Sequence, residues 1–286
     1  MSASSQLLCI DAGNTMVKLL ACGAHQWPDW QAPDLPVQHV PSQHWATPEH
    51  AMAHLCAALP SADTQATPPQ VLLCSVLGQA FGATLAQACA QLGWPLNTLV
   101  VQPGPTLGTR YCPASQLGLD RWAACLAVAS FTSSPVNLVL SFGTATTLDA
   151  VVRADLLPQP EESTPGSAWV HWGGYIVPGV SIMLNSLASA TAQLPQVDVA
   201  WSQWPTNTAD AIGAGVARMQ LGMVLQTLGD LRRQWSQYTP MVWCAGGHAH
   251  HVLPGLQDAG VPVEMLPHAV LRGVLFNHRA TQEGVS

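Results

Sequence analysis

The sequence predicts an α/β fold built from two related halves. Apolar runs of strand length occur at Leu7–Ile10, Val71–Val76 and Asn137–Phe142. After the first run, strand-like and helical segments alternate, which is typical of α/β proteins. The first and third runs each end in a glycine turn with hydroxyl side chains and then continue as strand. This repeat predicts two domains, residues 1–134 and 135–286. The last helix of the chain could pack back on the first domain.

Composition sets the class of protein. With 286 residues, 48% hydrophobic and 9% charged, the chain can bury a large core, and disorder is not expected. The net charge of −7 argues against binding to nucleic acid or to an anionic membrane. No apolar run is long enough to span a bilayer. The eight cysteines form no CxxC motif, and no signal segment starts the chain, so we expect reduced thiols in a cytoplasmic protein.

The elements of the first half follow from periodicity and breaker residues. Met16–Cys22 predicts a second strand that pairs with the first as a hairpin. The remaining expectations, in order, are irregular connections around weak strands at 25–48, a helix at 49–59, a surface loop at 60–70, a strand at 71–76, a helix at 80–92 and a strand at 96–101.

The second half is read in the same way. Asp120–Arg121 lies where a loop joins a helix, so Asp120 could be a helix cap beside a solvated arginine or a functional acid. Threonines before residue 209 predict an N-cap for a long amphipathic helix. The expected elements are an ordered loop at 103–116, a helix at 120–131, a strand at 137–142, a mobile loop at 153–168, a glycine-rich segment at 172–179 leading into a helix from about 181, a helix to about 236, a strand at 240–245 that ends at Gly246–Gly247, and a helix at 267–281.

The first turn, Asp11-Ala12-Gly13-Asn14-Thr15, suits a phosphate. Gly13 permits positive φ and close backbone approach, and turn N–H groups and small polar side chains can donate to phosphate oxygens. A carboxylate such as Asp11 can hold Mg²⁺ directly or through water. An ordinary Asx turn is the alternative. Lys18 is the only lysine, so a phosphate site here depends largely on backbone and hydroxyl donors, and Lys18 itself could be a phosphate contact or a solvated strand residue.

Other chemistries have weaker support. His248, His250 and His251 follow a glycine turn, but no fourth zinc ligand has the usual spacing, so a loop near a nucleotide is favoured over a metal site. The GxxxxGK[ST] phosphate loop and the GxSxG nucleophile motif are absent from the sequence.

A set of motifs in order resembles the type III pantothenate kinases, also described as Bvg-accessory-factor homologues. The resemblance covers nearly the whole chain and rests on Asp11-x-Gly13-Asn14-Thr15, Tyr111, Leu117-Gly118-x-Asp120-Arg121, Gly143-Thr144-Ala145-Thr146-Thr147-x-Asp149, Gly173-Gly174-x-Ile176-x-Pro178-Gly179, Asn207-Thr208-x-x-Ala211-Ile212 and Gly246-Gly247. It implies an actin-like fold, with two RNase-H-like domains and a nucleotide cleft between them, in a homodimer. The implied reaction is ATP-dependent phosphorylation of pantothenate to 4′-phosphopantothenate, the first step of coenzyme A synthesis.

The resemblance also implies roles for individual residues. Asp120 matches the catalytic base, and Asp11 would hold Mg²⁺ through water. Residues matching the ATP phosphate contacts are Asp11, Ala12, Gly13, Asn14, Thr15, Met16, Val17, Lys18 and Thr144. Residues matching the pantothenate contacts are Tyr111, Gly118, Leu119, Asp120, Arg121 and Thr208.

One position departs from the pattern. Many members carry an aspartate that binds a monovalent cation two residues before the glycine of the Gly-Thr-Ala-Thr-Thr stretch, where this chain has Ser141. A hydroxyl is a poorer ligand for K⁺ than a carboxylate, so we expect weak, altered or absent dependence on K⁺ or NH₄⁺. Two alternatives to pantothenate phosphorylation stay open: an actin-like kinase acting on another hydroxyl, such as that of a sugar, and a nucleotide-binding regulator without turnover.

Overall fold

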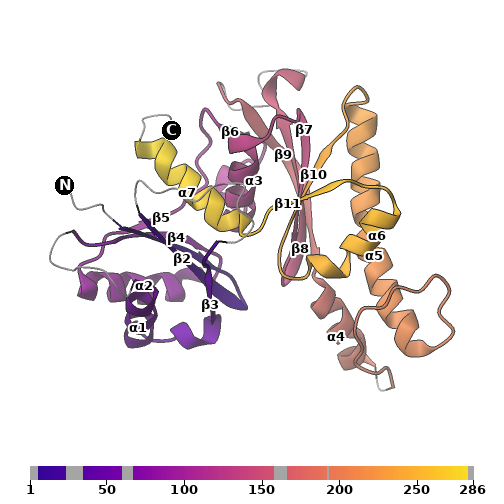
Figure 1. Ribbon diagram of the computed structural model, residues 1–286, viewed down its shortest axis with the longest axis horizontal. Helices are drawn as coiled ribbons and strands as arrows, with labels where there is room; N and C mark the ends of the chain where they lie inside the picture. The colour runs from indigo at the N-terminus through magenta and orange to yellow at the C-terminus, as the bar shows by residue number, and fades with distance from the viewer. Residues whose placement is uncertain (1–5, 24–34, 60–66, 158–165, 192, 283–286) are drawn as a thin grey trace. The chain divides into compact units, whose positions relative to one another are not determined.

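The computed structural model describes residues 6–23, 35–59, 67–157, 166–191 and 193–282 (Figure 1). These divide into two units. Unit 1 comprises the chain up to Thr106, Tyr111–Ser130 and the segment from His268 onward; unit 2 comprises Leu107–Arg110 and Phe131–Pro267.

Unit 1 is built on a five-stranded sheet. Its order is β3-β2-β1-β4-β5, with β1–β3 antiparallel and β4 and β5 added parallel to β1. The strands are β1 (Gln6–Ala12), β2 (Met16–Gly23), β3 (Gln38–Pro41), β4 (Gln70–Ser75) and β5 (Leu96–Thr98).

Helices cover both faces of this sheet. Alternate residues of β1, including Leu8 and Ile10, pack against α1 (Pro48–Ala58) and α2 (Gly78–Leu92). The C-terminal helix α7 (Ala269–Gln282) contacts β1 and β4. It also crosses α3 (Leu119–Phe131) so closely that a side chain at Gly273 would collide with the backbone of Ala123. Helix α7 is therefore part of the core of unit 1.

Unit 2 contains a six-stranded sheet of order β11-β10-β7-β8-β9-β6. Without the short edge strand β6, the order β9-β8-β7-β10-β11 repeats that of unit 1, with an antiparallel meander followed by two parallel strands. The two related halves expected from the sequence are thus confirmed. The strands are β6 (Leu107–Thr109), β7 (Val136–Phe142), β8 (Ala145–Arg153), β9 (Trp169–Pro178), β10 (Met241–Ala245) and β11 (Val263–Met265).

The helices of unit 2 form two packed groups. The long helix α5 (Thr208–Gln234) and α6 (Leu253–Asp258) bury side chains against β7, β8 and β10. The first turns of α5 pack separately on α4 (Val180–Ala190) through Val180, Leu184, Ile212 and Val216. Single turns of 3₁₀ helix occur at Ser42–Trp45, Ala114–Gln116, Ala154–Leu156 and Ala249–His251.

Most expected elements occur within one or two residues of their predicted bounds, but several predictions were wrong. The expected loop at 103–116 contains β6, which is too short to show an alternating pattern. No secondary structure was expected for the glycine-rich segment at 172–179; its residues up to Pro178 belong to β9, in which Gly173 at φ 141° accompanies a register shift opposite Ala150 and Val151. The strand expected to reach Val101 ends at Thr98, and Val100 is exposed.

Three further differences concern ends and short elements. The N-cap of α5 is Asn207, whose side chain accepts from the Asp210 N–H, and not a threonine. Strand β3 is one of the weak strands expected within 25–48, whereas the loop expected at 153–168 begins with Arg153, the last residue of β8. Helix α6 and strand β11 were not expected. The remaining parts of the loops predicted at 25–48, 60–70 and 153–168 fall partly on 24–34, 60–66 and 158–165, which lie outside the described residues.

Candidate active site

The turn between β1 and β2 is anchored from both sides. The Gly13 N–H donates to the Met16 carbonyl at 3.1 Å. Ser42 donates its hydroxyl to the Gly13 carbonyl at 2.6 Å and its N–H to the Thr15 carbonyl at 3.1 Å. Gly13 does not adopt the positive φ expected of it. The turn is held instead by these hydrogen bonds, with the side chains of Asn14 and Thr15 exposed.

Asp11 and Lys18 face each other across this hairpin. They are register partners in β1 and β2, and the Lys18 Nζ lies 2.9 Å from the Asp11 Oδ2. Asp11 is 7% exposed, and a buried carboxylate needs a charged or hydrogen-bonding partner. Ala12 and Val17, the next pair toward the turn, are buried and apolar. The hairpin therefore presents one carboxylate and the chain's single lysine beside an exposed polar turn.

Cys74 connects this hairpin electrostatically to α3. Cys74 lies beside Asp11 in the parallel register of β1 and β4. Burial raises the pKa of its thiol well above the usual value, and the charges of Asp11 and Asp120 raise that pKa further, whereas Lys18 opposes them. Both carboxylates therefore act on one buried thiol. Unit 1 brings together two acids that are far apart in the sequence.

The Asp120 carboxylate is held by its immediate neighbours. Asp120 lies in the first turn of α3, and its Oδ1 accepts the Arg121 N–H at 2.8 Å. A Cβ on Gly118 would stand 2.9 Å from the same oxygen. Only a residue without a side chain leaves that oxygen where it is. Leu119 begins the helix between them and is half-buried.

Arg121 is buried, so its interpretation as a solvated arginine was wrong. It is 4% exposed, and its Nη1 donates to the Tyr111 hydroxyl at 3.0 Å. The guanidinium carbon lies 5.6 Å from the centre of the Tyr111 ring. Tyr111 therefore holds a fixed positive charge next to Asp120. A planar guanidinium in this position is suited to a carboxylate ligand.

The β7–β8 turn of unit 2 corresponds to the β1–β2 turn of unit 1. The Gly143 N–H donates to the Ala145 carbonyl at 3.0 Å, and Thr144 is exposed at the tip. The Gly179 N–H donates to the Thr144 carbonyl at 3.0 Å. A Cβ on Gly179 would overlap the carbonyl oxygens of Gly143 and Thr144. The start of α4 is thus seated directly on this turn.

The segment after β10 packs on the same turn. Gly246 has φ 97°, and a Cβ there would overlap the backbone of Phe142. The His248 N–H donates to the Phe142 carbonyl at 3.1 Å, and its Nδ1 lies 3.2 Å from the Gly143 carbonyl oxygen. His250 directs its Nδ1 to the Gly247 carbonyl at 2.9 Å. Two of the three clustered histidines thus direct ring nitrogens to backbone oxygens.

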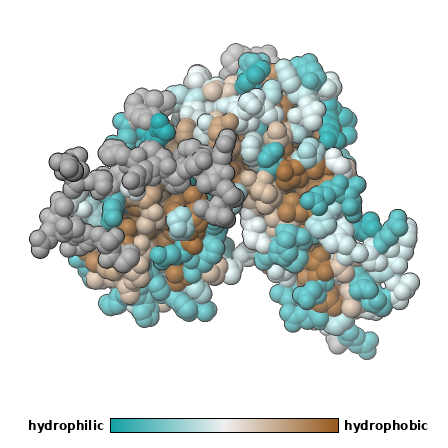
Figure 2. Space-filling model, viewed as in Figure 1, coloured by the Kyte–Doolittle hydropathy of each residue, from teal (hydrophilic) through white to brown (hydrophobic). Residues whose placement is uncertain are grey.

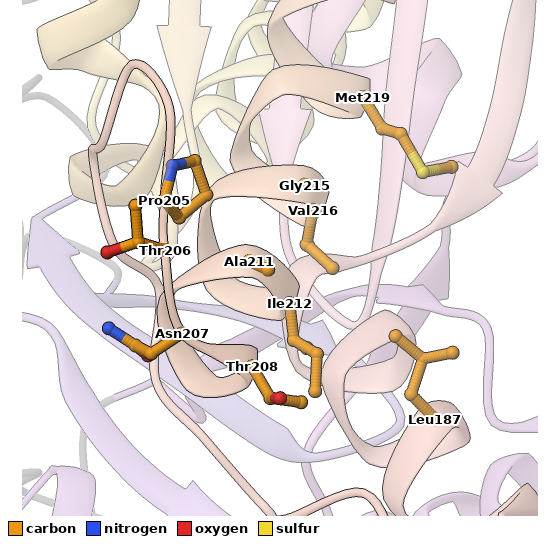
Figure 3. A pocket seen from close by; sticks show the side chains of 10 residues that line it. All are labelled: Leu187, Pro205, Thr206, Asn207, Thr208, Ala211, Ile212, Gly215, Val216 and Met219. Carbon is orange, nitrogen blue, oxygen red and sulfur yellow. The ribbon is translucent and has the colours of Figure 1, made fainter.

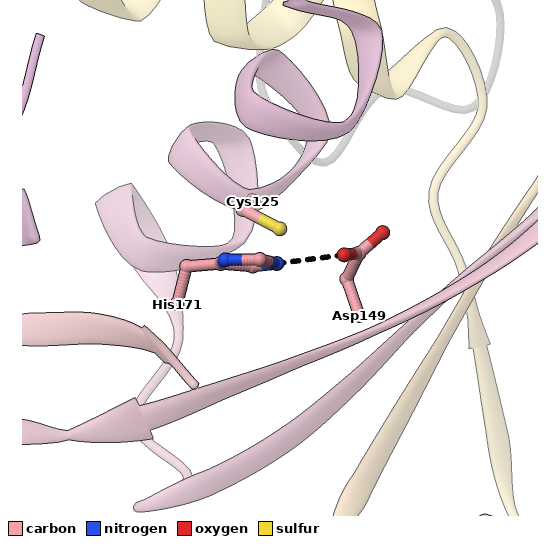
Figure 4. A group of neighbouring side chains, drawn as sticks. All are labelled: Cys125, Asp149 and His171. Carbon is pink, nitrogen blue, oxygen red and sulfur yellow. Dashed lines mark hydrogen bonds and ion pairs between the residues drawn. The ribbon is translucent and has the colours of Figure 1, made fainter. Parts of the chain in front are cut away.

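Asp149 belongs to a buried polar chain in unit 2. Its Oδ1 lies 2.7 Å from the His171 Nε2 (Figure 4). The His171 Nδ1 lies 3.2 Å from the Thr109 hydroxyl. Asp149 and His171 are 2% and 0% exposed. Their side chains connect three neighbouring strands, β8, β9 and β6. This acid of the Gly-Thr-Ala-Thr-Thr stretch therefore has a structural hydrogen-bonding role.

Thr208 lines a groove between α4 and α5. The groove has a volume of about 730 Å³. Figure 3 shows Thr206, Asn207 and Thr208 at its edge, where α5 begins, with Leu187 reaching in from α4. The residues that line the groove are mainly apolar. Thr208 begins α5, whereas Thr144 lies in the β7–β8 turn.

Two residues of the candidate site were not identified from the sequence. Ser42 anchors the first turn from a segment read as irregular, and Cys74 lies among apolar strand residues. Neither has a motif that could have identified it, because each acts through register or a loop contact. Gly118 was identified by its motif, but its steric relation to Asp120 required the structure.

The fold is that of the actin-like ATPases and sugar kinases. A protein of Sinorhizobium meliloti, provisionally described as a 2-dehydro-3-deoxygalactonokinase, matches with a TM-score of 0.56 at 13% identity, covering 97% of this chain and 99% of its own. A protein of Campylobacter jejuni, provisionally described as a Baf family transcriptional activator, matches with a TM-score of 0.55 at 15% identity, covering 97% and 98%. None of the helices in the described ranges is both long and apolar enough to cross a membrane.

Sequence relatives narrow this class to one family. The profile of the type III pantothenate kinases matches residues 7–229. The type III pantothenate kinase of Cupriavidus pinatubonensis is 32% identical over 95% of this chain and 98% of its own length. That of Bordetella bronchiseptica is 31% identical over 84% and 82%. The chain belongs to the type III pantothenate kinase family, and the resemblance inferred from its motifs is confirmed.

Proposed function

We propose that this protein transfers the γ-phosphoryl group of ATP to the primary hydroxyl of pantothenate, with Asp120 as the general base. The product is 4′-phosphopantothenate, the first intermediate of coenzyme A synthesis. Family membership over most of the chain is the observation that carries the reaction. The placement of Asp120 beside the buried Arg121 supports its role. The eight cysteines, all free thiols, support a cytoplasmic location.

Asp120 has the properties that phosphoryl transfer requires of a base. The pantothenate hydroxyl attacks the γ-phosphorus, its proton passes to the Asp120 carboxylate, and ADP leaves. Such reactions depend on positioning and on stabilisation of charge more than on covalent help from the protein. The Arg121 N–H holds one carboxylate oxygen, and Gly118 leaves room for it. The chain therefore orients the base before substrate arrives.

Two turns would hold the phosphates. The proposed phosphate contacts in unit 2 are limited to Thr144. Those in unit 1 are Asp11, Ala12, Gly13, Asn14, Thr15, Met16, Val17 and Lys18. The partly exposed Lys18 can exchange Asp11 for a phosphate oxygen, since both are anionic ligands for one ammonium group. The buried carboxylate of Asp11 fits Mg²⁺, which takes one or two protein oxygens, water and substrate phosphates. Bound Mg²⁺ would neutralise charge that develops on the phosphates.

Pantothenate would be recognised by Tyr111, Gly118, Leu119, Asp120, Arg121 and Thr208. Arg121 offers its fork to the pantothenate carboxylate, with Tyr111 fixing the side chain that does so. Thr208 offers a hydroxyl at the first turn of α5. A carboxylate-binding arginine favours pantothenate over a neutral sugar.

A monovalent cation is expected to matter little here. Ser141 is the penultimate residue of β7, two positions before Gly143, where many members of the family have aspartate. We propose weak or altered activation by K⁺ or NH₄⁺. Steep activation by K⁺ that disappears in Ser141→Ala would contradict this, and Ser141→Asp should increase the dependence on K⁺.

We propose that the protein is a homodimer through the outer surface of α4 and α5. Ile182, Leu187 and Met219 are 44%, 36% and 62% exposed, and Trp204 before α5 is 85% exposed. Figure 2 shows hydrophobic residues gathered at the surface over α4. Clusters of exposed apolar side chains usually mark interaction sites, and a second copy is the partner that the family resemblance implies.

The deciding assay uses purified protein with ATP and Mg²⁺, with and without K⁺ or NH₄⁺. Pantothenate, a panel of sugars and a no-substrate control are compared by the mass of the phosphorylated product. We expect phosphorylation of pantothenate alone. Phosphorylation of a sugar would assign another substrate, and ATP binding without any product would support a regulatory role.

A further inference from the structure

Cys9 and Cys22 form a pair of thiols at the far end of the first hairpin. The register pairs Leu7 with Cys22 and Cys9 with Leu20. The two cysteines are therefore diagonal neighbours on one face of β1 and β2. Each of the two thiols influences the pKa of the other. Cys9 is fully buried, whereas Cys22 is partly exposed.

The two thiols have unequal access and reactivity. The hydrogen bond from Cys9 lowers the pKa of the Cys22 thiol, although burial partly opposes this. A thiolate that solvent can reach is the form that oxidants attack. By contrast, burial raises the pKa of Cys9 well above the usual value, that of Cys89 to about 11 and that of Cys244 to about 12. Cys22 is thus suited to react first, with Cys9 as its diagonal neighbour on the same face.

We propose that Cys9 and Cys22 are a peroxide-sensitive dithiol that closes to a disulfide. The Cys22 thiolate attacks hydrogen peroxide, forming Cys22 sulfenic acid and releasing hydroxide. The Cys9 thiol then attacks the sulfenic sulfur, forming the S–S bond and releasing water. Two thiols are oxidised by two electrons in total, one peroxide is reduced to two waters, and a thiol reductant reverses the change.

Closure would act on the phosphate-binding turn. Diagonal neighbours in a sheet are about 7–8 Å apart between Cα atoms, at or beyond the range of about 7 Å that a disulfide bridges without backbone movement. The S–S bond therefore requires β1 and β2 to shift. Cys9 lies two residues before Asp11 on the same face, and Asp11 pairs with Lys18. Weaker ATP binding by the oxidised form follows, a consequence that rests on the proposed function of this turn.

Peptide mapping tests the bond directly. The full-length reduced protein is treated with hydrogen peroxide, alkylated and digested with trypsin. Lys18, the only lysine, separates the two cysteines, so the disulfide keeps two peptides joined until a reductant is added. A second protease then distinguishes Cys22 from the other cysteines of its peptide. We expect a loss of two hydrogens in intact mass and a Cys9–Cys22 linkage.

Matched variants define the outcome. Cys22→Ser should keep full basal activity and lose the linkage. Cys56→Ser, at an exposed cysteine outside the pair, should still form the Cys9–Cys22 linkage. Cys9→Ser, which keeps a hydrogen-bond donor beside Cys22, should leave a sulfenic acid on Cys22 that dimedone traps. Linkage of other cysteines, or Cys22 that remains fully alkylatable after peroxide, would overturn the proposal. Because the readout is mass, it is independent of whether the protein phosphorylates pantothenate; a linked protein with unchanged ATP binding would overturn the effect on the turn.

Discussion

The Asp120 carboxylate shows how single residues shape the candidate site. One of its oxygens accepts the Arg121 N–H, and it shares with Asp11 an effect on the pKa of Cys74. Arg121 is in turn held by Tyr111. Each charge has a defined neighbour, so small substitutions can separate chemistry from folding.

Asp120→Asn should lower kcat by about 10²–10⁴-fold, the usual size of a general-base contribution. Asparagine keeps the oxygen that accepts the Arg121 N–H but cannot take the substrate proton. The melting temperature and the KM for ATP should change little. Asp258→Asn, at an exposed position in α6, is the control. Unchanged kcat in Asp120→Asn would remove Asp120 from this role.

Gly118→Ala tests the space around the same carboxylate. The new Cβ would stand 2.9 Å from the Asp120 Oδ1, and that oxygen is the end of a side chain that can move away. Displacement of a catalytic group by about 1 Å can cost up to about 10²-fold in rate, so we expect a fall in kcat of about 10–10²-fold with little loss of stability.

The control for this substitution is Gly82→Ala in α2, where a Cβ meets nothing within 4 Å. It should leave kcat unchanged and raise stability by about 0.4–1 kcal/mol, because alanine restricts the unfolded chain. Steady-state kinetics and urea denaturation measure both variants. Equal kcat in the two would show that Asp120 is not constrained by Gly118.

At the scale of elements, each proposed phosphate turn joins two antiparallel strands and is supported by a distant segment. Ser42 supports the first turn, and the start of α4 supports the second. These contacts link loop geometry to helix placement. A substitution at the start of α4 should therefore move Thr144, although the substituted residue itself does not contact a ligand.

Gly179→Ala should separate α4 from the β7–β8 turn. The new Cβ would overlap the Gly143 oxygen and stand 2.5 Å from the Thr144 oxygen, and backbone atoms cannot move aside as a side chain can. We expect a loss of about 1–3 kcal/mol in the free energy of unfolding, the usual cost of overpacking, and a raised Kd for ATP.

Gly222→Ala in α5 is the matched control, since a Cβ there meets nothing within 4 Å. Urea denaturation and calorimetric ATP titration compare the two variants. Wild-type ATP affinity in a folded Gly179→Ala protein would contradict a phosphate role for Thr144.

At the scale of the whole molecule, the chain repeats one sheet order in two units and adds β6 to the second. Corresponding hairpins carry the two proposed phosphate turns. Unit 2 also carries the exposed apolar surface of α4 and α5. We expect this apolar surface to form the interface of the proposed homodimer.

Met219→Asp should convert the proposed dimer to a monomer of 30.2 kDa. A carboxylate in an apolar interface loses hydration without gaining a partner. Val100→Asp, at an exposed apolar position of unit 1 that is 58% exposed, should leave the dimer intact. Light scattering across a range of protein concentrations measures the mass. A monomeric wild type at all concentrations would contradict the proposal.

Much of the fold was predictable from local patterns. The apolar runs of β1, β4 and β7 and the helical spacing of α1, α2, α3 and α5 identified these elements. Short or irregular elements escaped prediction. Three-residue strands have no measurable period, and the glycine-rich sequence of β9 did not identify a strand, because its conformation depends on pairing with β8.

The sequence by itself determined the α/β class, the two halves and the family, because these follow from periodicity and from motifs in order. Tertiary structure alone decided which groups meet. It brought Asp11 and Asp120 close enough to Cys74 for both to raise its pKa, and it buried Arg121 against Tyr111. It also seated Gly179 on the Thr144 turn and made Cys9 and Cys22 diagonal neighbours. The physical reason is that steric fit and charge interactions depend on distances between atoms, and residues remote in the chain become neighbours only through strand register and helix packing.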